Sequence, residues 1–234
     1  MSNPTIVLVH GAFADSSSWN GVIERLRAQG HSVIAAANPL RGLDSDAAYI
    51  ASVLDDVAGP VVLAGHSYGG SVITVAAAGK SNVTALVYIA AFIPAEGESA
   101  LQLTDKFPGS TLGPTTRPAS YPIPGAEAGT ELYIRAAEFP QQFADDVPAA
   151  TAELMAATQR PVAVAALSEP AAAAAWKSVP SFSLITTADK NIPVQVQRFM
   201  AERAGAHVVE IDASHAVSVS QPEAVADLIG LAAK

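Results

Sequence analysis

Five consecutive residues, Gly65-His66-Ser67-Tyr68-Gly69, place a serine between two glycines. This G-x-S-x-G pattern is typical of a nucleophilic serine on a sharp turn between a strand and a helix, where only small residues fit beside it. The apolar run from Pro60 to Ala64 precedes the motif, and an apolar, helix-like segment starts near Gly69. Because the surroundings match the mechanics of the motif, we predict that Ser67 is a nucleophile.

Two later residues have the types and positions that such a serine needs. Asp189 comes just after a predicted strand at 182–186, and His215 just after one at 207–211. Open parallel sheets gather functional side chains at the carboxyl ends of their strands. The triad that accompanies a G-x-S-x-G turn runs in the order serine, aspartate, histidine. A serine hydroxyl is too weak an acid to attack an ester unaided, so we predict that His215 is its base and Asp189 orients the imidazole.

Three other carboxylates could take the place of the predicted acid. Asp212 lies three residues before the histidine, and Glu96 and Glu98 follow a strand that ends near residue 90. The position directly after a strand, in the expected chain order, favours Asp189 over all three.

The end of the first predicted strand offers a further element of this chemistry. His10-Gly11 follows the apolar run 5–9, where a loop must pass close to the serine and can present a backbone N–H. His10 and His66 are expected to be structural, shaping this loop and the serine turn. The histidines and acids lack metal-ligand spacing and the chain has no cysteine. We therefore expect neither a metal nor any other cofactor, and disulfides are excluded.

The elements that must position these residues alternate in the first third of the chain and again at its end. Apolar, β-branched runs predict strands at 5–9, 32–36, 60–64, 83–90, 182–186 and 207–211. Helices are predicted between them, at 19–29, 47–57, 69–78, 194–204 and 222–232. This alternation with fully apolar strands indicates an α/β fold whose six-stranded, mostly parallel sheet is covered by helices on both faces.

The alternation stops between residues 94 and 179. This segment contains nine prolines after residue 94 and no clear strand, with helical patches at 131–138, 149–157 and 171–176. Its length of about 85 residues far exceeds an ordinary loop. We therefore expect a single domain over 1–234, with a core of 1–93 and 180–234 and a mostly helical cap inserted at about 94–179.

Composition limits the classes of partner. The chain of 234 residues is 50% hydrophobic and 15% charged, with a formal net charge of −9. An acidic surface disfavours nucleic acids and anionic membrane surfaces. No apolar stretch approaches the ~20 residues of a membrane span, and the N-terminal residues lack a signal-peptide pattern. We expect a cytoplasmic protein with a small-molecule partner, and the apolar composition is compatible with a homodimer.

Taken together, these motifs resemble the α/β-hydrolase superfamily, in particular small bacterial esterases related to plant methyl-ester esterases and hydroxynitrile lyases. The resemblance spans the chain outside the cap. It rests on Val7-Leu8-Val9-His10-Gly11-Ala12, Trp19, Gly65-His66-Ser67-Tyr68-Gly69-Gly70, Thr186-Thr187-Ala188-Asp189 and Ser214-His215.

The resemblance implies a substrate site around the serine. The backbone N–H groups of Tyr68 and Ala12 would form the oxyanion hole, with Phe13 as the alternative to Ala12. Phe13, Trp19 and Trp176 are expected to line the substrate pocket. The implied activity is cofactor-free hydrolysis of a small carboxylic ester through an acyl-enzyme.

Other activities on the same triad stay open. By resemblance, plant hydroxynitrile lyases carry a lysine directly after the catalytic histidine and a threonine in the oxyanion loop. Here Ala216 and Gly11-Ala12 stand at these places, which argues against the lyase. C–C bond hydrolysis and perhydrolase activity use the same three residues. A ligand-binding receptor on this scaffold usually accompanies loss of the triad, and here the triad residues are present.

Overall fold

A single parallel sheet forms the centre of the structure, a computed structural model that describes residues 3–234. Its six strands lie in the order β2-β1-β3-β4-β8-β9, and every neighbouring pair is parallel. The strands are β1 (Thr5–Val9), β2 (Val33–Ala36), β3 (Val61–His66), β4 (Val83–Ile89), β8 (Ser181–Thr186) and β9 (His207–Ile211). The predicted α/β fold with a six-stranded sheet is confirmed, and each strand end lies within two residues of its predicted place.

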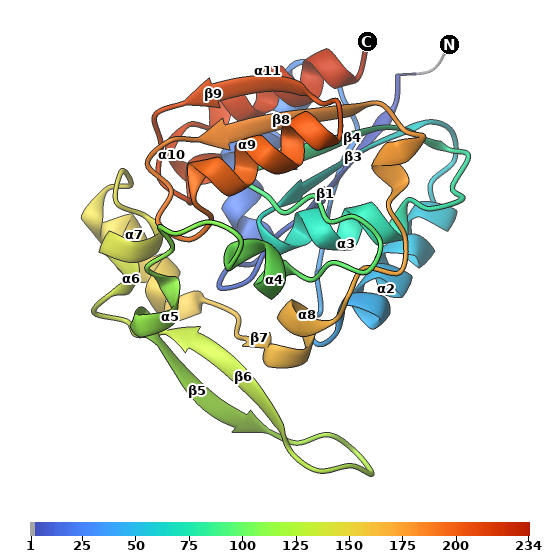
Figure 1. Ribbon diagram of the computed structural model, residues 1–234. Helices are drawn as coiled ribbons and strands as arrows, with labels where there is room; N and C mark the ends of the chain where they lie inside the picture. Colours follow the sequence, from blue (N-terminus) through green and yellow to red (C-terminus); the bar gives the residue numbers. More distant parts are fainter. Residues whose placement is uncertain (1–2) are drawn as a thin grey trace.

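Helices cover both faces of this sheet (Figure 1). The helices α1 (Asn20–Ala28) and α11 (Pro222–Ala232) pack on one face, and α2 (Leu43–Asp55), α3 (Tyr68–Ala76) and α9 (Val194–Arg203) on the other. Side chains alternate between the faces of a strand, so Ile6 and Leu8 join the first layer while Val7 and Val9 join the second. None of the described helices is long and apolar enough to cross a membrane.

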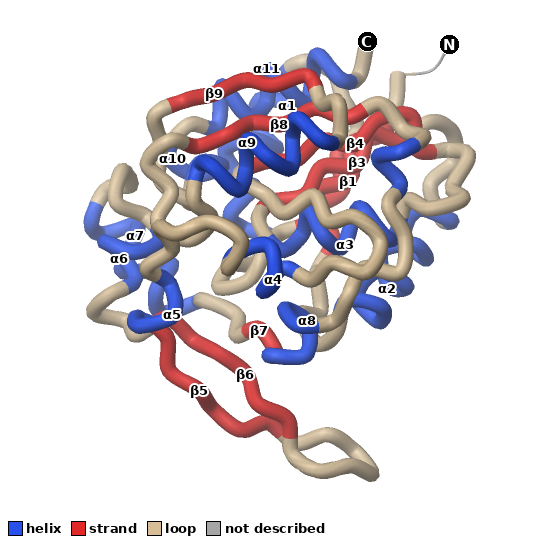
Figure 2. The backbone as a smooth tube through the Cα atoms, viewed as in Figure 1, coloured by secondary structure: helices blue, strands red, loops and turns tan. Residues whose placement is uncertain are grey.

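The segment between β4 and β8 is the inserted cap, and it contains three strands beside the expected helices (Figure 2). Its helices are α4 (Ala100–Thr104), α5 (Leu112–Thr115), α6 (Phe139–Phe143), α7 (Ala149–Thr158) and α8 (Val164–Ser168). A further short helix, α10 (Val217–Ser220), lies outside the cap, after β9. Three antiparallel strands accompany the helices of the cap: β5 (Thr116–Tyr121), β6 (Gly129–Ile134) and β7 (Val162–Ala163).

Two helices predicted in the cap are wrong, whereas the one at 149–157 is confirmed as α7. Residues 129–134 form β6 because they pair with 116–121, a partner that residue spacing within 131–138 cannot reveal. The alanine-rich run 171–176 forms only a 3-10 turn at Ala175–Lys177. Its start is held by backbone hydrogen bonds between Ala171 and the loop at 97–98 in place of helical bonds.

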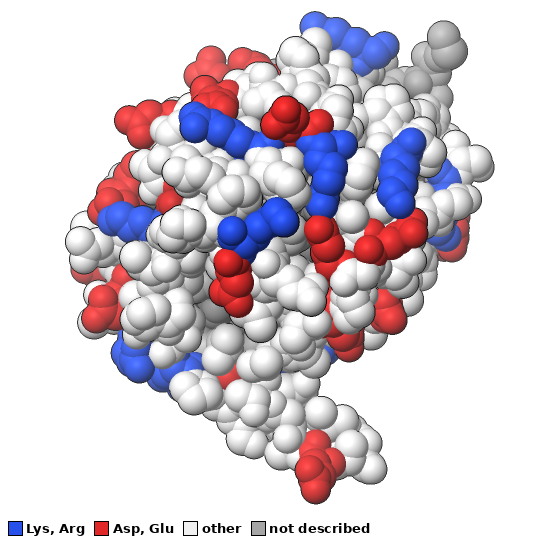
Figure 3. Space-filling view, viewed as in Figure 1, with Lys and Arg blue, Asp and Glu red and all other residues white. Residues whose placement is uncertain are grey.

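The β5–β6 hairpin projects from the body (Figure 1), and Arg41 contacts its outer half. Arg41 forms an ion pair with the buried Glu131 of β6 and lies over the ring of Tyr121 of β5, 4.4 Å from its centroid. Acidic and basic side chains are mixed over the face shown in Figure 3, and the projecting hairpin is largely uncharged there except near its tip.

The start of α3 requires a glycine at position 69. A Cβ atom at Gly69 would press against the carbonyl oxygen of Val9, at the end of β1, which is backbone and cannot move aside. We expect Gly69→Ala to lower the free energy of unfolding by about 1–3 kcal/mol, measured by urea denaturation. Gly113→Ala is the matched control, because a Cβ there meets no atom within 4 Å. Equal stabilities of the two variants would contradict this close approach.

Candidate active site

Ser67 lies on the tight turn that joins β3 to α3. Its backbone has φ 54° and ψ −124°, in the left-handed half of conformational space that a non-glycine residue rarely adopts. The end of β4 and the segment after it hold the turn in this conformation. The N–H of Ser67 donates to the carbonyl oxygen of Ile89 at 3.2 Å, and the N–H of Phe92 donates to the carbonyl oxygen of Ser67 at 3.1 Å. The serine therefore lies at the carboxyl edge of the sheet.

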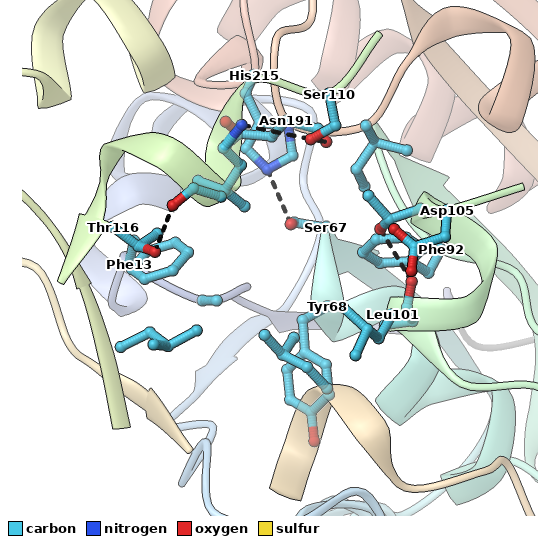
Figure 4. A pocket seen from close by; sticks show the side chains of 18 of the residues that line it. Phe13, Ser67, Tyr68, Phe92, Leu101, Asp105, Ser110, Thr116, Asn191 and His215 are labelled. Atoms are coloured by element: carbon cyan, nitrogen blue, oxygen red, sulfur yellow. Dashed lines mark hydrogen bonds between the residues drawn. The ribbon is translucent and has the colours of Figure 1, made fainter. Parts of the chain in front are cut away.

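The structure brings Ser67, His215 and Asp189 into one hydrogen-bonded chain (Figure 4 shows the first two). His215 Nε2 lies 2.8 Å from Ser67 Oγ, and His215 Nδ1 lies 2.7 Å from Asp189 Oδ2. An ionised carboxylate only accepts, so Nδ1 carries the proton and Nε2 is free to accept from the hydroxyl. All three residues are buried, with exposed fractions of 6%, 1% and 8% for Ser67, His215 and Asp189. This geometry allows His215 to remove the serine proton.

The carboxylate of Asp189 is fixed by donors other than the histidine. Its Oδ1 accepts from the backbone N–H groups of Asn191 at 2.8 Å and Ile192 at 3.0 Å. Its Oδ2 also accepts from Gln197 Nε2 and Thr186 Oγ1, both at 3.1 Å. Gln197, buried on α9, was missed by the sequence analysis, because no motif distinguishes it from the other polar residues of that helix.

The three rival carboxylates do not contact the histidine. Glu96 and Glu98 form ion pairs with basic side chains, and Asp212 accepts a hydrogen bond from a threonine hydroxyl. The guanidinium that pairs with Glu98 lowers the pKa of this carboxyl. Of the four candidates, Asp189 is the one whose carboxylate reaches the ring of His215.

Two backbone N–H groups beside the serine are available to a developing negative charge. Tyr68 is the first residue of α3, so its N–H has no acceptor within the helix. No acceptor within residues 3–234 takes the N–H of Ala12. The N–H of Phe13, in contrast, donates to the carbonyl oxygen of Arg160 at 3.0 Å. The geometry therefore favours Ala12 and Tyr68 over Phe13 as the donor pair.

A cavity of about 280 Å³ opens in front of Ser67 and His215 (Figure 4). Phe13 lines it, as expected. The other large apolar side chains around it are Tyr68, Phe92, Leu101, Leu112, Leu132, Leu167 and Ile192. Most of these come from the cap, whose side-chain directions the sequence does not reveal.

The two tryptophans predicted to line the pocket do not do so. Trp19 is fully buried in the layer beneath α1, with its ring edge-on to that of His66 at 6.3 Å between centroids. Trp176 donates from Nε1 to the carbonyl oxygen of Pro94 at 2.8 Å. Both are large aromatics whose hydrophobic surface is used in packing, which a sequence cannot distinguish from pocket lining.

His66 and His10 both support backbone near the site. His66 Nε2 donates to the carbonyl oxygen of His215 at 2.8 Å, and burial holds its pKa well below the usual value. His10 Nδ1 donates to the carbonyl oxygen of Gly11 at 2.9 Å, while its Nε2 accepts from the N–H of Asn38 at 3.0 Å. Both rings are neutral, and each makes a contact that supports the structural role expected for it.

His10 should make stability depend on pH. Burial lowers its pKa from 6.5 to about 4, so between these values the unfolded chain takes up a proton that the folded chain does not. The stability present above pH 6.5 is therefore lost as the pH falls toward 4, and we expect His10 to contribute a loss of about 3 kcal/mol to the free energy of unfolding. Guanidinium denaturation at pH 7 and pH 4.5 measures this loss. His10→Gln should show a shallower decline, and an unchanged decline would refute the assignment.

The comparisons with known proteins agree with this fold. The profile of the alpha/beta hydrolase family matches residues 6–228. The carbendazim hydrolyzing esterase of Nocardioides sp. (strain SG-4G) is 34% identical over 113 residues, which span 43% of this chain and 47% of that protein, less than half its length. The alpha/beta hydrolase nvfD of Aspergillus novofumigatus (strain IBT 16806) is 26% identical over 255 aligned positions, covering 100% of this chain and 98% of that protein.

A solved structure extends the likeness over the whole fold. The crystal structure of polyneuridine aldehyde esterase superposes with a TM-score of 0.86 and 22% sequence identity, covering 100% of both chains. At this level of identity the likeness concerns the fold. Because the family profile spans nearly the whole sequence, the predicted membership is confirmed: this chain belongs to the alpha/beta hydrolase family.

Proposed function

We propose that this protein is a cofactor-free serine hydrolase that cleaves carboxylic esters of small molecules through an acyl-enzyme. The observation that carries the proposal is the hydrogen-bonded chain Ser67–His215–Asp189 at the wall of a mostly apolar cavity. The names of the two relatives, an esterase and a hydrolase, support the same class of reaction.

The first half of the reaction forms the acyl-enzyme. Ser67 Oγ attacks the ester carbonyl carbon while His215 Nε2 takes the hydroxyl proton, and Asp189 stabilises the imidazolium that results. The carbonyl oxygen becomes an oxyanion, which accepts hydrogen bonds from the N–H groups of Ala12 and Tyr68. When the tetrahedral intermediate collapses, the imidazolium returns its proton to the departing alcohol oxygen, and the acyl group stays on Ser67.

The second half releases the acid. A water molecule takes the place of the alcohol, His215 Nε2 removes one of its protons, and the resulting hydroxide attacks the acyl carbon. A second tetrahedral intermediate forms at the same two N–H groups. Its collapse expels the serine oxygen, which recovers a proton from His215, and the carboxylic acid leaves.

The cavity limits the size of the substrate. Its volume of about 280 Å³ lies at the lower end of the range of small-molecule sites. Bulky side chains line it, among them Phe13 from the core and Leu112 and Leu132 from the cap. We therefore infer that esters with short acyl chains are the better substrates.

Removing the serine hydroxyl should abolish ester cleavage. With p-nitrophenyl esters of increasing acyl length, we expect the wild type to hydrolyse the short ones and Ser67→Ala to be slower by at least ~10³-fold, because no nucleophile replaces Oγ. Release of p-nitrophenol measures both rates. Equal rates in the two proteins would refute the serine mechanism. Cleavage of racemic mandelonitrile without any ester turnover would indicate a lyase.

The choice of acid can be tested with two matched variants. Asp189→Asn removes the carboxylate that sets the tautomer of His215, so kcat for a short p-nitrophenyl ester should fall by roughly 10⁴-fold. Asp212→Asn makes the same chemical change three residues from the histidine, at a carboxylate that does not contact it, and kcat should stay within about twofold. A larger loss in Asp212→Asn than in Asp189→Asn would reverse the assignment.

A further inference from the structure

One residue with a charged side chain contributes to the lining of the cavity, and it is exposed to solvent. Asp105 follows the last residue of α4 and is the one Asp, Glu, Lys or Arg among the residues that line the cavity. Figure 4 places it on the side of the cavity formed by Phe92 and Leu101. The proposed ester cleavage does not use it, since the triad and the oxyanion donors lie on the core.

The carboxylate of Asp105 has no ionic partner within the described residues, 3–234. Its neighbour Lys106 extends over the ring of Phe199, 4.8 Å from the centroid. Lys190, which precedes the cavity residue Asn191, forms an ion pair with Asp145 at 2.9 Å. Neither lysine forms an ion pair with Asp105, so its carboxylate, which is exposed to solvent, faces the cavity without a direct ionic partner.

Aromatic side chains share the cavity with this carboxylate. Phe13, Tyr68 and Phe92 all contribute to its lining. The faces of aromatic rings attract cations, most strongly where water is excluded, and such rings combined with an acid are a common means of binding ammonium groups. An anionic group in the same place would meet a carboxylate and neither lysine nor arginine. The net charge of −9 also favours the approach of cations over anions at longer range.

We propose that the cavity selects esters carrying a positively charged ammonium group over anionic esters of the same size, and that Asp105 determines this selectivity. As a statement about the reaction, it rests on the ester cleavage proposed above. As a statement about binding, it does not require turnover.

The kinetic test uses three acetate esters of similar size that differ in charge. Acetylcholine is cationic, 3,3-dimethylbutyl acetate is its neutral isostere, and 4-acetoxybutanoate is anionic. In the wild type we expect kcat/KM, relative to the uncatalysed rate, to decrease in this order. In Asp105→Asn the ratio of kcat/KM for the cationic ester to that for the neutral one should fall about fivefold, and the ratio of anionic to neutral should rise about as much. Salt at 0.5 M should weaken the selectivity of the wild type.

The control is Glu127→Gln, which removes one negative charge from the exposed tip of the β5–β6 hairpin. All three rates should remain those of the wild type. If Asp105→Asn leaves the charge selectivity unchanged, or if Glu127→Gln alters it as much, the role of Asp105 is refuted.

A binding measurement separates this proposal from the proposed ester cleavage. Isothermal titration of Ser67→Ala with phenyltrimethylammonium and with benzenesulfonate compares a cation and an anion of similar size on a protein that cannot turn over. We expect the cation to bind more tightly, and the preference to shrink about fivefold when Asp105→Asn is added. Equal binding of the two probes would overturn the inference even if esters are cleaved. Cation preference in a protein that cleaves no ester would leave the cavity assignment standing and refute the hydrolase.

Discussion

The close approach of backbone at the turn around Ser67 is the constraint on which the rest of the site depends. A side chain at Gly65 would meet the start of α3, and one at Gly70 would meet the carbonyl oxygen of Phe92. Without side chains at these positions, α3 can begin directly against the ends of its neighbouring strands. The serine is then forced to φ 54°, with its hydroxyl at the edge of the sheet where β8 and β9 deliver the aspartate and the histidine. Strain is tolerated because backbone hydrogen bonds on both sides fix the turn.

The cap contributes to this geometry as well as to the cavity. The backbone N–H of Ala216, directly after the catalytic histidine, donates to the carbonyl oxygen of Phe143 in α6 at 3.0 Å. The rings of Phe143 and His215 meet edge-on, 4.9 Å between centroids. On the other side of the site, the loop that carries Phe13 is bonded to the carbonyl oxygen of Arg160. The cap thus fixes the loop that carries His215 and the loop that carries Ala12 and Phe13. Changes at the cap residues that make these contacts, Phe143 and Arg160, would therefore disturb the proposed chemistry.

The sequence predicts those features of the structure that depend on local patterns of residues. The six strands, the five long helices and the placement of Ser67, Asp189 and His215 after strands all follow from residue spacing along short segments. The β5–β6 hairpin depends on pairing between residues 116–121 and 129–134, which the spacing of residues within one of these segments does not reveal. Gln197 acquires its contact with Asp189 only when α9 packs on the sheet. The sequence also does not show in which direction a side chain points. Trp19, for example, packs in the core and does not reach the cavity.

The cavity wall and the anchoring contacts lie in different parts of the cap, and this separates selectivity from chemistry. The segment 100–116 supplies Leu101, Asp105 and Leu112 to the wall, whereas Phe143 and Arg160 hold the loops of the core. Replacing one of these three side chains changes the size or charge of the cavity, and none of the three is hydrogen-bonded to the triad. Selectivity for charge can depend on a single charged side chain near the bound substrate. A substitution at Asp105 can therefore change this selectivity without disturbing the strained turn at Ser67.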